Sequence, residues 1–206
     1  YDGLGRPFIF ACRTNGAAVW DQICSTHGVA PGSYQEREAA LQSKTPDEQL
    51  VIWQPRIESF PVSPEIPVSR TPGTGDFASD YAGVIDSSLG ILWYYTKDMS
   101  DSSEPLKVTG GPTASRAICE RVASMWRRPV VRVGASGAAY GAALAAAAGL
   151  FRDEFPNDDP AERISALLQT GDTIQPDPEL IRRYHTGGDA YVPRLIVAFS
   201  QRVQEL

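Results

Sequence analysis

The chain has 206 residues, of which 42% are hydrophobic and 21% are charged. These values are ordinary for a globular protein, and the length allows one large domain or two small ones. The formal charge of −6 gives no reason to expect nucleic acid as a partner, because phosphate backbones select basic surfaces.

Targeting and redox signals are few. Three widely spaced cysteines, Cys12, Cys24 and Cys119, indicate free thiols in a reducing compartment, not a disulfide framework or a zinc site. The chain opens at Tyr1 without an initiator methionine or an apolar leader, so we expect a piece of a longer protein without a signal peptide. Residues 134–150 are too short for a membrane span of about 20 residues, and we expect no membrane partner.

The first elements are one strand and two helices. Residues 8–12 are wholly apolar and predict a strand. Helix-spaced apolar pairs predict a helix over 17–24. A second helix is expected over 34–42, with Ser33 as its N-cap and Glu36 completing a capping box.

A proline-rich segment and a long helix follow. Six prolines interrupt residues 43–76, so we predict a strand at 50–53 and otherwise an extended excursion over the surface. Asp76 is expected to cap a long helix, whose apolar residues follow steps of three and four from Phe77 to Trp93.

The most informative stretch predicts a strand, a glycine turn, a helix and a second strand. The first strand begins at Leu106, the turn contains Gly110 and Gly111, and the second strand covers 130–133. Such a turn brings bare backbone close to a ligand, and a helix start offers free N–H groups to an anion. Nucleotide binding is therefore the first hypothesis, and a tight connection without a ligand is the alternative.

The remaining segments are mainly helical in pattern. A helix is predicted over 137–149, where Gly137 and Gly141 lie one turn apart and leave a strip open to a ligand or to another helix. A short helical patch at 164–168 and an amphipathic terminal helix from Val192 complete the chain. This order predicts a layered α/β domain with a parallel crossover.

A set of catalytic groups is not evident in the sequence. His27 and His185 have no acidic or cysteine partner at metal-ligand spacing, so we expect both to be solvated loop residues. No serine lies in a nucleophile elbow, and no lysine follows a phosphate-binding glycine loop. We therefore expect a nucleotide platform with no catalytic residue and no metal ligand of its own.

Several segments, in this order and spacing, resemble the FGGY carbohydrate kinases, which belong to the sugar kinase, hexokinase and actin superfamily. The C-terminal signature of that family is similar to Val108–Gly111, Arg128–Val131 and Gly137–Leu144. Phe10–Gly16 and Tyr184–Leu206 resemble further segments of its xylulokinase branch, which is the most similar. The resemblance implies an α/β fold, namely a ribonuclease H-like C-terminal lobe of the actin and hexokinase type.

The resemblance also implies the boundaries of the lobe and its binding residues. Residues 1–206 would form the nucleotide-binding lobe, incomplete at its N-terminal hairpin and without the N-terminal sugar-binding lobe. The implied nucleotide-binding residues are Gly110, Gly111, Ser115, Tyr34, Gly137 and Gly141. Tyr34 would pack on the adenine, and Ser115 departs from the asparagine that these kinases often have there. The catalytic aspartate and the phosphate-binding hairpin would lie before Tyr1.

The implied activity is transfer of the γ-phosphate of ATP to a hydroxyl of a ketose or polyol, with D-xylulose as the first choice. ATP or ADP would bind this lobe, Mg²⁺ would be held mainly outside it, and the sugar would bind the missing lobe. A cytoplasmic location is expected, and a homodimer is one assembly that the resemblance allows. We expect the chain alone to be inactive. The alternatives are an FGGY kinase for glycerol, gluconate or ribulose, and a degenerate kinase-like interaction module without catalysis.

Overall fold

The computed structural model describes residues 7–30, 32–46, 49–73, 75–99, 103–134, 138–155, 157–167 and 170–205. Its helices are α1 (Ala17–Thr26), α2 (Tyr34–Gln42), α3 (Phe77–Thr96), the 3-10 turn η1 (Gly111–Ala114), α4 (Arg116–Trp126), α5 (Ala138–Glu154), α6 (Pro160–Leu167), α7 (Pro178–His185) and α8 (Tyr191–Glu205). Its strands are β1 (Leu50–Gln54), β2 (Glu58–Ser59), β3 (Val62–Ser63), β4 (Ile66–Thr71), β5 (Leu106–Val108), β6 (Val130–Val133) and β7 (Thr170–Ile174).

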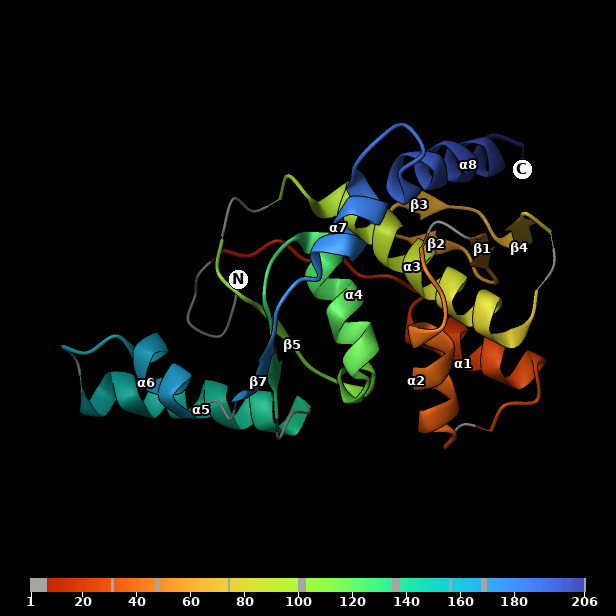
Figure 1. The fold of residues 1–206 in the computed structure, drawn as a ribbon. Coiled ribbons are helices and arrows are strands. Elements are labelled where there is room, and N and C mark those ends of the chain that lie inside the picture. Colours follow the sequence, from red (N-terminus) through yellow and green to blue (C-terminus); the bar gives the residue numbers. More distant parts are fainter. Residues whose placement is uncertain are drawn as a thin grey trace.

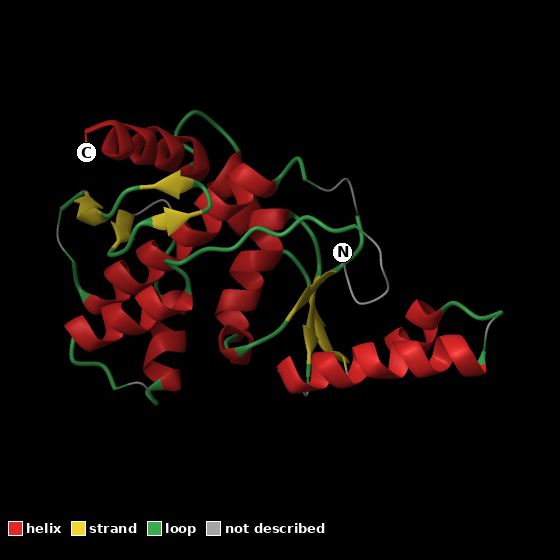
Figure 2. Ribbon diagram, turned by 180° about the vertical axis from the view of Figure 1, so that it is seen from behind, coloured by secondary structure: helices red, strands yellow, loops and turns green. Residues whose placement is uncertain are grey.

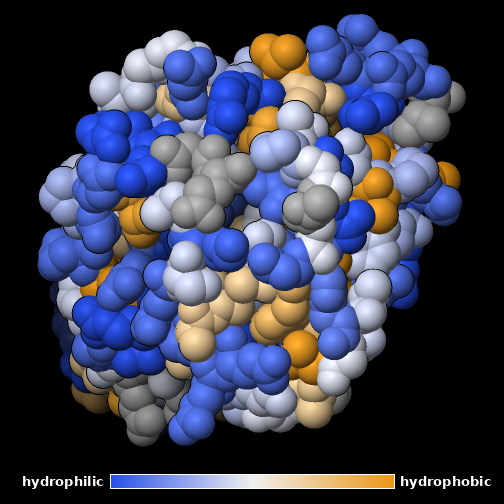
Figure 3. Space-filling view, turned by 45° about the vertical axis from the view of Figure 1, so that its right-hand side comes forward, coloured by the Kyte–Doolittle hydropathy of each residue, from blue (hydrophilic) through white to orange (hydrophobic). Residues whose placement is uncertain are grey.

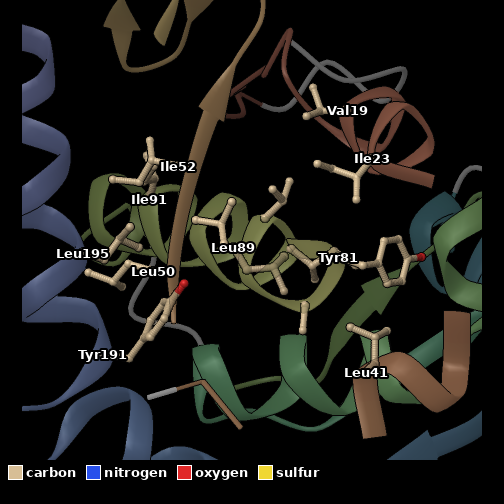
Figure 4. Packing of buried hydrophobic residues seen from close by; sticks show 14 of the residues in the cluster. Val19, Ile23, Leu41, Leu50, Ile52, Tyr81, Leu89, Ile91, Tyr191 and Leu195 are labelled. Atoms are coloured by element: carbon tan, nitrogen blue, oxygen red, sulfur yellow. The ribbon is translucent and has the colours of Figure 1, made fainter. Parts of the chain in front are cut away.

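Helix α3 is the centre of the main hydrophobic core. Every residue from Asp80 to Ser87 is buried, so all sides of this part of the helix face protein. Helices α1, α2, α4 and α8 and strand β1 pack around it (Figures 1 and 4). Gly83 allows β1 to approach closely, because a Cβ at that position would lie 2.5 Å from Cγ2 of Val51.

A small three-stranded sheet has the order β5-β6-β7. Strands β5 and β6 are parallel, with Leu106 opposite Val130, and α4 forms the crossover between them. This arrangement confirms the predicted strand, turn, helix and strand. Strand β7 pairs antiparallel to β6, with Ile174 opposite Val130. It was not predicted, because only Ile174 of its five residues is buried.

Strands β1 and β4 form a second, antiparallel sheet in which Val51 lies opposite Arg70. Strand β1 confirms the strand predicted at 50–53. The extended excursion predicted around it is wrong, because the chain makes the β2–β3 hairpin and then returns as β4. Pro67 is tolerated within β4 because each strand of a two-stranded sheet has a free edge.

The strand predicted at 8–12 is not formed. Residues 7–12 are described without strand pairing, and the side chains of Phe8 and Phe10 are 57% and 76% exposed. The apolar pattern predicts a strand, but no described segment pairs with this part of the chain.

The helices predicted at 17–24, at 34–42 and after Asp76 are confirmed as α1, α2 and α3. Asp76 caps α3 as predicted, because its carboxylate accepts a hydrogen bond from the Ser79 N–H at 2.7 Å. The capping box at Ser33 is wrong, since its side chain makes no capping hydrogen bond.

The later helices also agree with the sequence pattern. The helix predicted over 137–149 is α5, although Gly137 lies outside the described residues. The patch predicted at 164–168 belongs to α6, with residue 168 outside the description, and the terminal helix is α8. Helices α5 and α6 lie beyond the small sheet, away from α3 (Figures 1 and 2).

The face of the molecule in Figure 3 is mainly hydrophilic, and its hydrophobic residues are scattered among polar ones. None of the helices in the described ranges is both long enough and apolar enough to span a bilayer.

The prediction that both histidines are solvated loop residues is wrong, because His27, although in the turn after α1, is paired with a buried acid, and His185 belongs to α7. His27 Nε2 lies 2.8 Å from the buried carboxylate of Asp80, which also accepts hydrogen bonds from Arg70. His185 ends α7, and its ring centroid lies 4.5 Å from that of Trp93. Both histidines have partners distant in sequence, which local context does not reveal.

A buried ion pair joins α3 to α4. Arg121 donates to both carboxylate oxygens of Asp86 at 2.7 and 2.6 Å, and the Tyr184 hydroxyl donates to the same carboxylate. The second terminal nitrogen of Arg121 donates to the carbonyl oxygens of Leu41 at 2.7 Å and Lys44 at 2.9 Å. One guanidinium therefore holds α4, α3 and the C-terminal end of α2 together.

We expect Arg121→Met to lower the free energy of unfolding by about 3–5 kcal/mol, because the carboxylate of Asp86 would lose its buried partner. Arg182→Gln is the matched control, since it removes an ion pair with Glu179 whose two side chains are more than half exposed. That change should cost less than about 1 kcal/mol. Urea denaturation measures both values, and equal costs would contradict the role assigned to Arg121.

Protonation of His185 should make the free energy of unfolding depend on pH. Its Nε2 lies 2.9 Å from the carbonyl oxygen of Met125, which can only accept, so Nε2 carries a proton. Burial, and then the charge of Arg127, lowers the pKa of His185 to about 4. The unfolded chain protonates near its ordinary pKa of about 6.5, so stability falls as pH decreases from about 6.5 to about 4.

The loss from this group should reach about 3 kcal/mol at most. In His185→Gln the amide can still donate to Met125, so the fold should persist with a shallower pH dependence across this window. Urea denaturation at intervals between about pH 7 and about pH 4 compares the two proteins. Identical slopes would show that His185 is not the titrating group.

Candidate functional site

A cleft of about 780 Å³ lies among α1, α2, α3 at Tyr81 and the start of α4. Its volume is within the range of small-molecule sites. Helix α2 and the start of α4 lie next to each other in the fold (Figure 1). Its lining includes the aromatic side chains of Trp20, Tyr34 and Tyr81, together with Gly111, Pro112, Ala114 and Ser115 from the turn before α4.

The glycine turn depends on Gly110. Its φ of 96° and ψ of −178° are essentially open only to glycine. The Gly110 carbonyl accepts hydrogen bonds from the Thr113 hydroxyl at 2.7 Å and the Thr113 N–H at 3.1 Å, which close the η1 turn. Arg132 of β6 donates to the Thr113 carbonyl at 3.3 Å, so the turn is also held from the sheet.

Gly111 lines the cleft and differs from Gly110 in its environment. No atom lies within 4 Å of a Cβ built at Gly111, and its φ is not in the left-handed region. A side chain here would project into open space. The bare backbone of Gly111 is therefore accessible to a ligand.

The first turn of α4 is capped by two protein side chains. Ser115 Oγ accepts a hydrogen bond from the Ile118 N–H at 3.1 Å and donates one to Glu38 at 2.5 Å. The other carboxylate oxygen of Glu38 accepts from the Ala117 N–H at 2.8 Å. A carboxylate from α2 thus lies where the helix dipole favours an anion.

The remaining charges at the cleft form ion pairs along its rim. Arg37 donates to Asp21 at 2.8 Å, and Arg116 donates to Glu120 at 2.9 Å. Burial raises the pKa of Tyr81 to about 12, so this phenol stays protonated. The lining therefore presents aromatic and backbone surface with two carboxylates, Asp21 paired with Arg37 and Glu38 bonded to the start of α4.

The structure brings half of the predicted binding residues to this cleft. Tyr34, Gly111 and Ser115 line it, and Gly110 immediately precedes Gly111. Tyr34 is 68% exposed, which leaves its ring free to stack on a ligand.

The two other predicted residues lie elsewhere. Gly141 is on α5, which contributes no residue to the lining of the cleft. Gly137 lies outside the described residues.

Sequence reasoning missed Trp20 and Glu38. Glu38 follows Tyr34 by one helical turn and shares its face of α2, so its proximity to a ligand on Tyr34 could have been inferred. Its hydrogen bond to Ser115, 77 residues away, has no local signal.

A second hollow, of about 720 Å³, lies between residues 7–11 and the ends of α3 and α4. None of the predicted binding residues lines it. In the described parts of the chain, no three histidine, cysteine or acidic side chains come together as a metal site would require.

Comparison with solved structures identifies the fold. The chain superposes on xylulose kinase from Rhodospirillum rubrum with a TM-score of 0.70 and 18% identity, covering 95% of this chain and 39% of that one. For ligand-bound xylulose kinase and for gluconate kinase, both from Lactobacillus acidophilus, the TM-scores are 0.67 and 0.64. The identities are 15% and 17%, and in each case 94% of this chain and 39% of that one are covered.

No protein-family profile matches the chain, and no curated protein sequence matches it. The likeness is therefore one of fold. The chain has the fold of one lobe of these sugar kinases and spans about two fifths of their length. This result confirms the expected α/β lobe and the resemblance from which it was predicted.

Proposed function

We propose that this chain is the nucleotide-binding lobe of an ATP-dependent sugar kinase. The adenosine part of ATP would occupy the cleft among α1, α2 and the start of α4. The observation that carries the proposal is the position of Tyr34 and Gly111, an exposed aromatic ring and a bare backbone, on the lining of one cleft of suitable volume. A planar base can stack on the ring while the rest of the nucleoside lies against the glycine.

The N–H groups at the start of α4 already have hydrogen-bond acceptors, which favours adenosine over phosphate as the group bound beside them. Helix starts commonly bind phosphate, but here the Ala117 and Ile118 N–H groups already donate to Glu38 and Ser115. A phosphate would have to displace a carboxylate that the helix dipole favours. The phosphates would therefore lie away from α4.

Mg²⁺ is expected to arrive with the phosphates, since it is usually held by phosphate oxygens and one or two carboxylates. The carboxylates at the cleft do not fit such a site, because Glu38 caps α4 and Asp21 is paired with Arg37. Mg²⁺ would be bound by parts of the protein outside this chain.

Phosphoryl transfer depends on positioning and on charge stabilisation around the γ-phosphate. The two arginines that line the cleft, Arg37 and Arg116, already pair with Asp21 and Glu120. This chain would therefore orient ATP, and the other lobe would carry the sugar and the base. We propose D-xylulose as the substrate and gluconate as the alternative, because both kinds of kinase are among the structural neighbours. A cytoplasmic location agrees with the free thiols of Cys12, Cys24 and Cys119.

One observation favours a second candidate, a kinase-like interaction module without catalysis. The hydroxyl of Ser115 is engaged with Glu38, at a position where the kinases that the chain resembles often have an asparagine that contacts the nucleotide. A protein in which this contact is lost would bind ATP poorly or not at all, so nucleotide binding separates the two candidates.

Gly111→Val tests the site in the full-length protein. The valine would enter the ligand path without a clash inside the protein, so we expect Mg-ATP affinity to fall at least about 10-fold with an unchanged melting temperature. Gly149→Val on exposed α5 is the matched control and should bind normally. Calorimetry measures the affinities. Unchanged ATP binding by Gly111→Val would refute the assignment of this cleft as the nucleotide site. If the wild type did not bind nucleotide at millimolar concentration, the interaction module would be favoured.

The substrate is tested by coupled ADP release from the full-length protein on a panel of ketoses, polyols and sugar acids. We expect turnover on D-xylulose, and none with residues 1–206 alone, because the γ-phosphate has no catalytic partner in this chain. Turnover on gluconate or glycerol without xylulose would refute the substrate assignment. Turnover by residues 1–206 alone would refute the proposal that this lobe binds ATP while the other lobe carries the sugar and the catalytic base.

A further inference from the structure

Glu38 is a carboxylate on the wall of the cleft that is fixed in place by neutral donors. One oxygen accepts from the Ser115 hydroxyl at 2.5 Å and the other from the Ala117 N–H at 2.8 Å. The arginines at the cleft are paired with other acids, Arg37 with Asp21 and Arg116 with Glu120. Within the described residues, neither of these arginines forms an ion pair with Glu38.

Each oxygen of Glu38 can accept a further hydrogen bond. A carboxylate offers about four acceptor positions, and the two contacts to Ser115 and Ala117 use only two of them. Glu38 lines the cleft and is only partly buried, so a ligand can reach the remaining positions. Such a group attracts hydroxyl or amine donors and repels phosphate.

The position of Glu38 relative to Tyr34 selects between these donors. The two residues are four apart on α2, which places their Cβ atoms about 5–6 Å from each other on one face. If the base stacks on the ring of Tyr34, the group that reaches Glu38 is the sugar attached to that base. Acidic side chains bind ribose hydroxyls in this manner in other nucleotide folds.

We propose that Glu38 is a specificity-determining residue that accepts a hydrogen bond from a ribose hydroxyl of the nucleotide and keeps the phosphates away from the start of α4. This inference rests on the proposed nucleotide site and adds to it. It assigns recognition of the ribose to α2, and it explains why the first turn of α4 is capped by a carboxylate in a protein proposed to bind a polyanion.

The test compares ATP, 2′-deoxy-ATP and 3′-deoxy-ATP by calorimetry with the full-length protein. The wild type should bind at least one deoxynucleotide about 10-fold more weakly than ATP, which is the effect of losing one hydrogen bond to a charged group. In Glu38→Gln the preference should fall below about 3-fold, because the amide is a weaker acceptor than the carboxylate. The amide oxygen can still accept from Ala117, so the fold should be retained.

Glu36→Gln is the matched control, because Glu36 is exposed on the same helix and does not line the cleft. It should keep the full preference for ATP. Equal affinity of the wild type for all three nucleotides would overturn the assignment of Glu38 and leave the nucleotide site standing, and this outcome requires no variant. An undiminished preference in Glu38→Gln would also overturn it. Absence of binding to every nucleotide would overturn the proposed function and this inference with it.

Discussion

The buried ion pair between Asp86 and Arg121 is the constraint on which the site depends. Arg121 lies on α4, bonds to α3 through Asp86, and donates to the carbonyls of Leu41 and Lys44 at the end of α2. Two of the helices that border the cleft, α2 and α4, are thus fixed to one another through a group buried in the core. Removing a partner from such a pair leaves a buried charge unsatisfied, so the cleft geometry and the stability of the fold are linked.

In that geometry the start of α4 is already occupied by a carboxylate of the protein. A glycine turn followed by a helix ordinarily favours an anion, yet here Glu38 of α2 already occupies this position with Ser115. The cleft consequently offers aromatic surface at Tyr34, bare backbone at Gly111 and, at Glu38, a carboxylate bonded to neutral donors. This combination suits a nucleoside better than a phosphate, which agrees with a lobe proposed to hold only one end of ATP.

The features predictable from the sequence are those encoded locally. The turn at Gly110, the cap at Asp76 and the spacing of apolar residues along α3 each depend on a few neighbouring residues. Strand β7 and the bond of Ser115 to Glu38 depend on contacts distant in sequence, so single-segment patterns do not reveal them. The apolar run at 8–12 shows the converse, because a strong strand pattern forms no strand without a pairing partner.

The central claim is that adenosine binds between α2 and the glycine turn, and a structure of the full-length protein with ADP tests it most directly. The account predicts the base on Tyr34, the ribose hydroxyls at Glu38 and the sugar against Gly111, with the phosphates directed away from α4. A base bound outside this cleft, for example along α5 at Gly141, or a phosphate seated on the Ala117 N–H in place of Glu38, would contradict it.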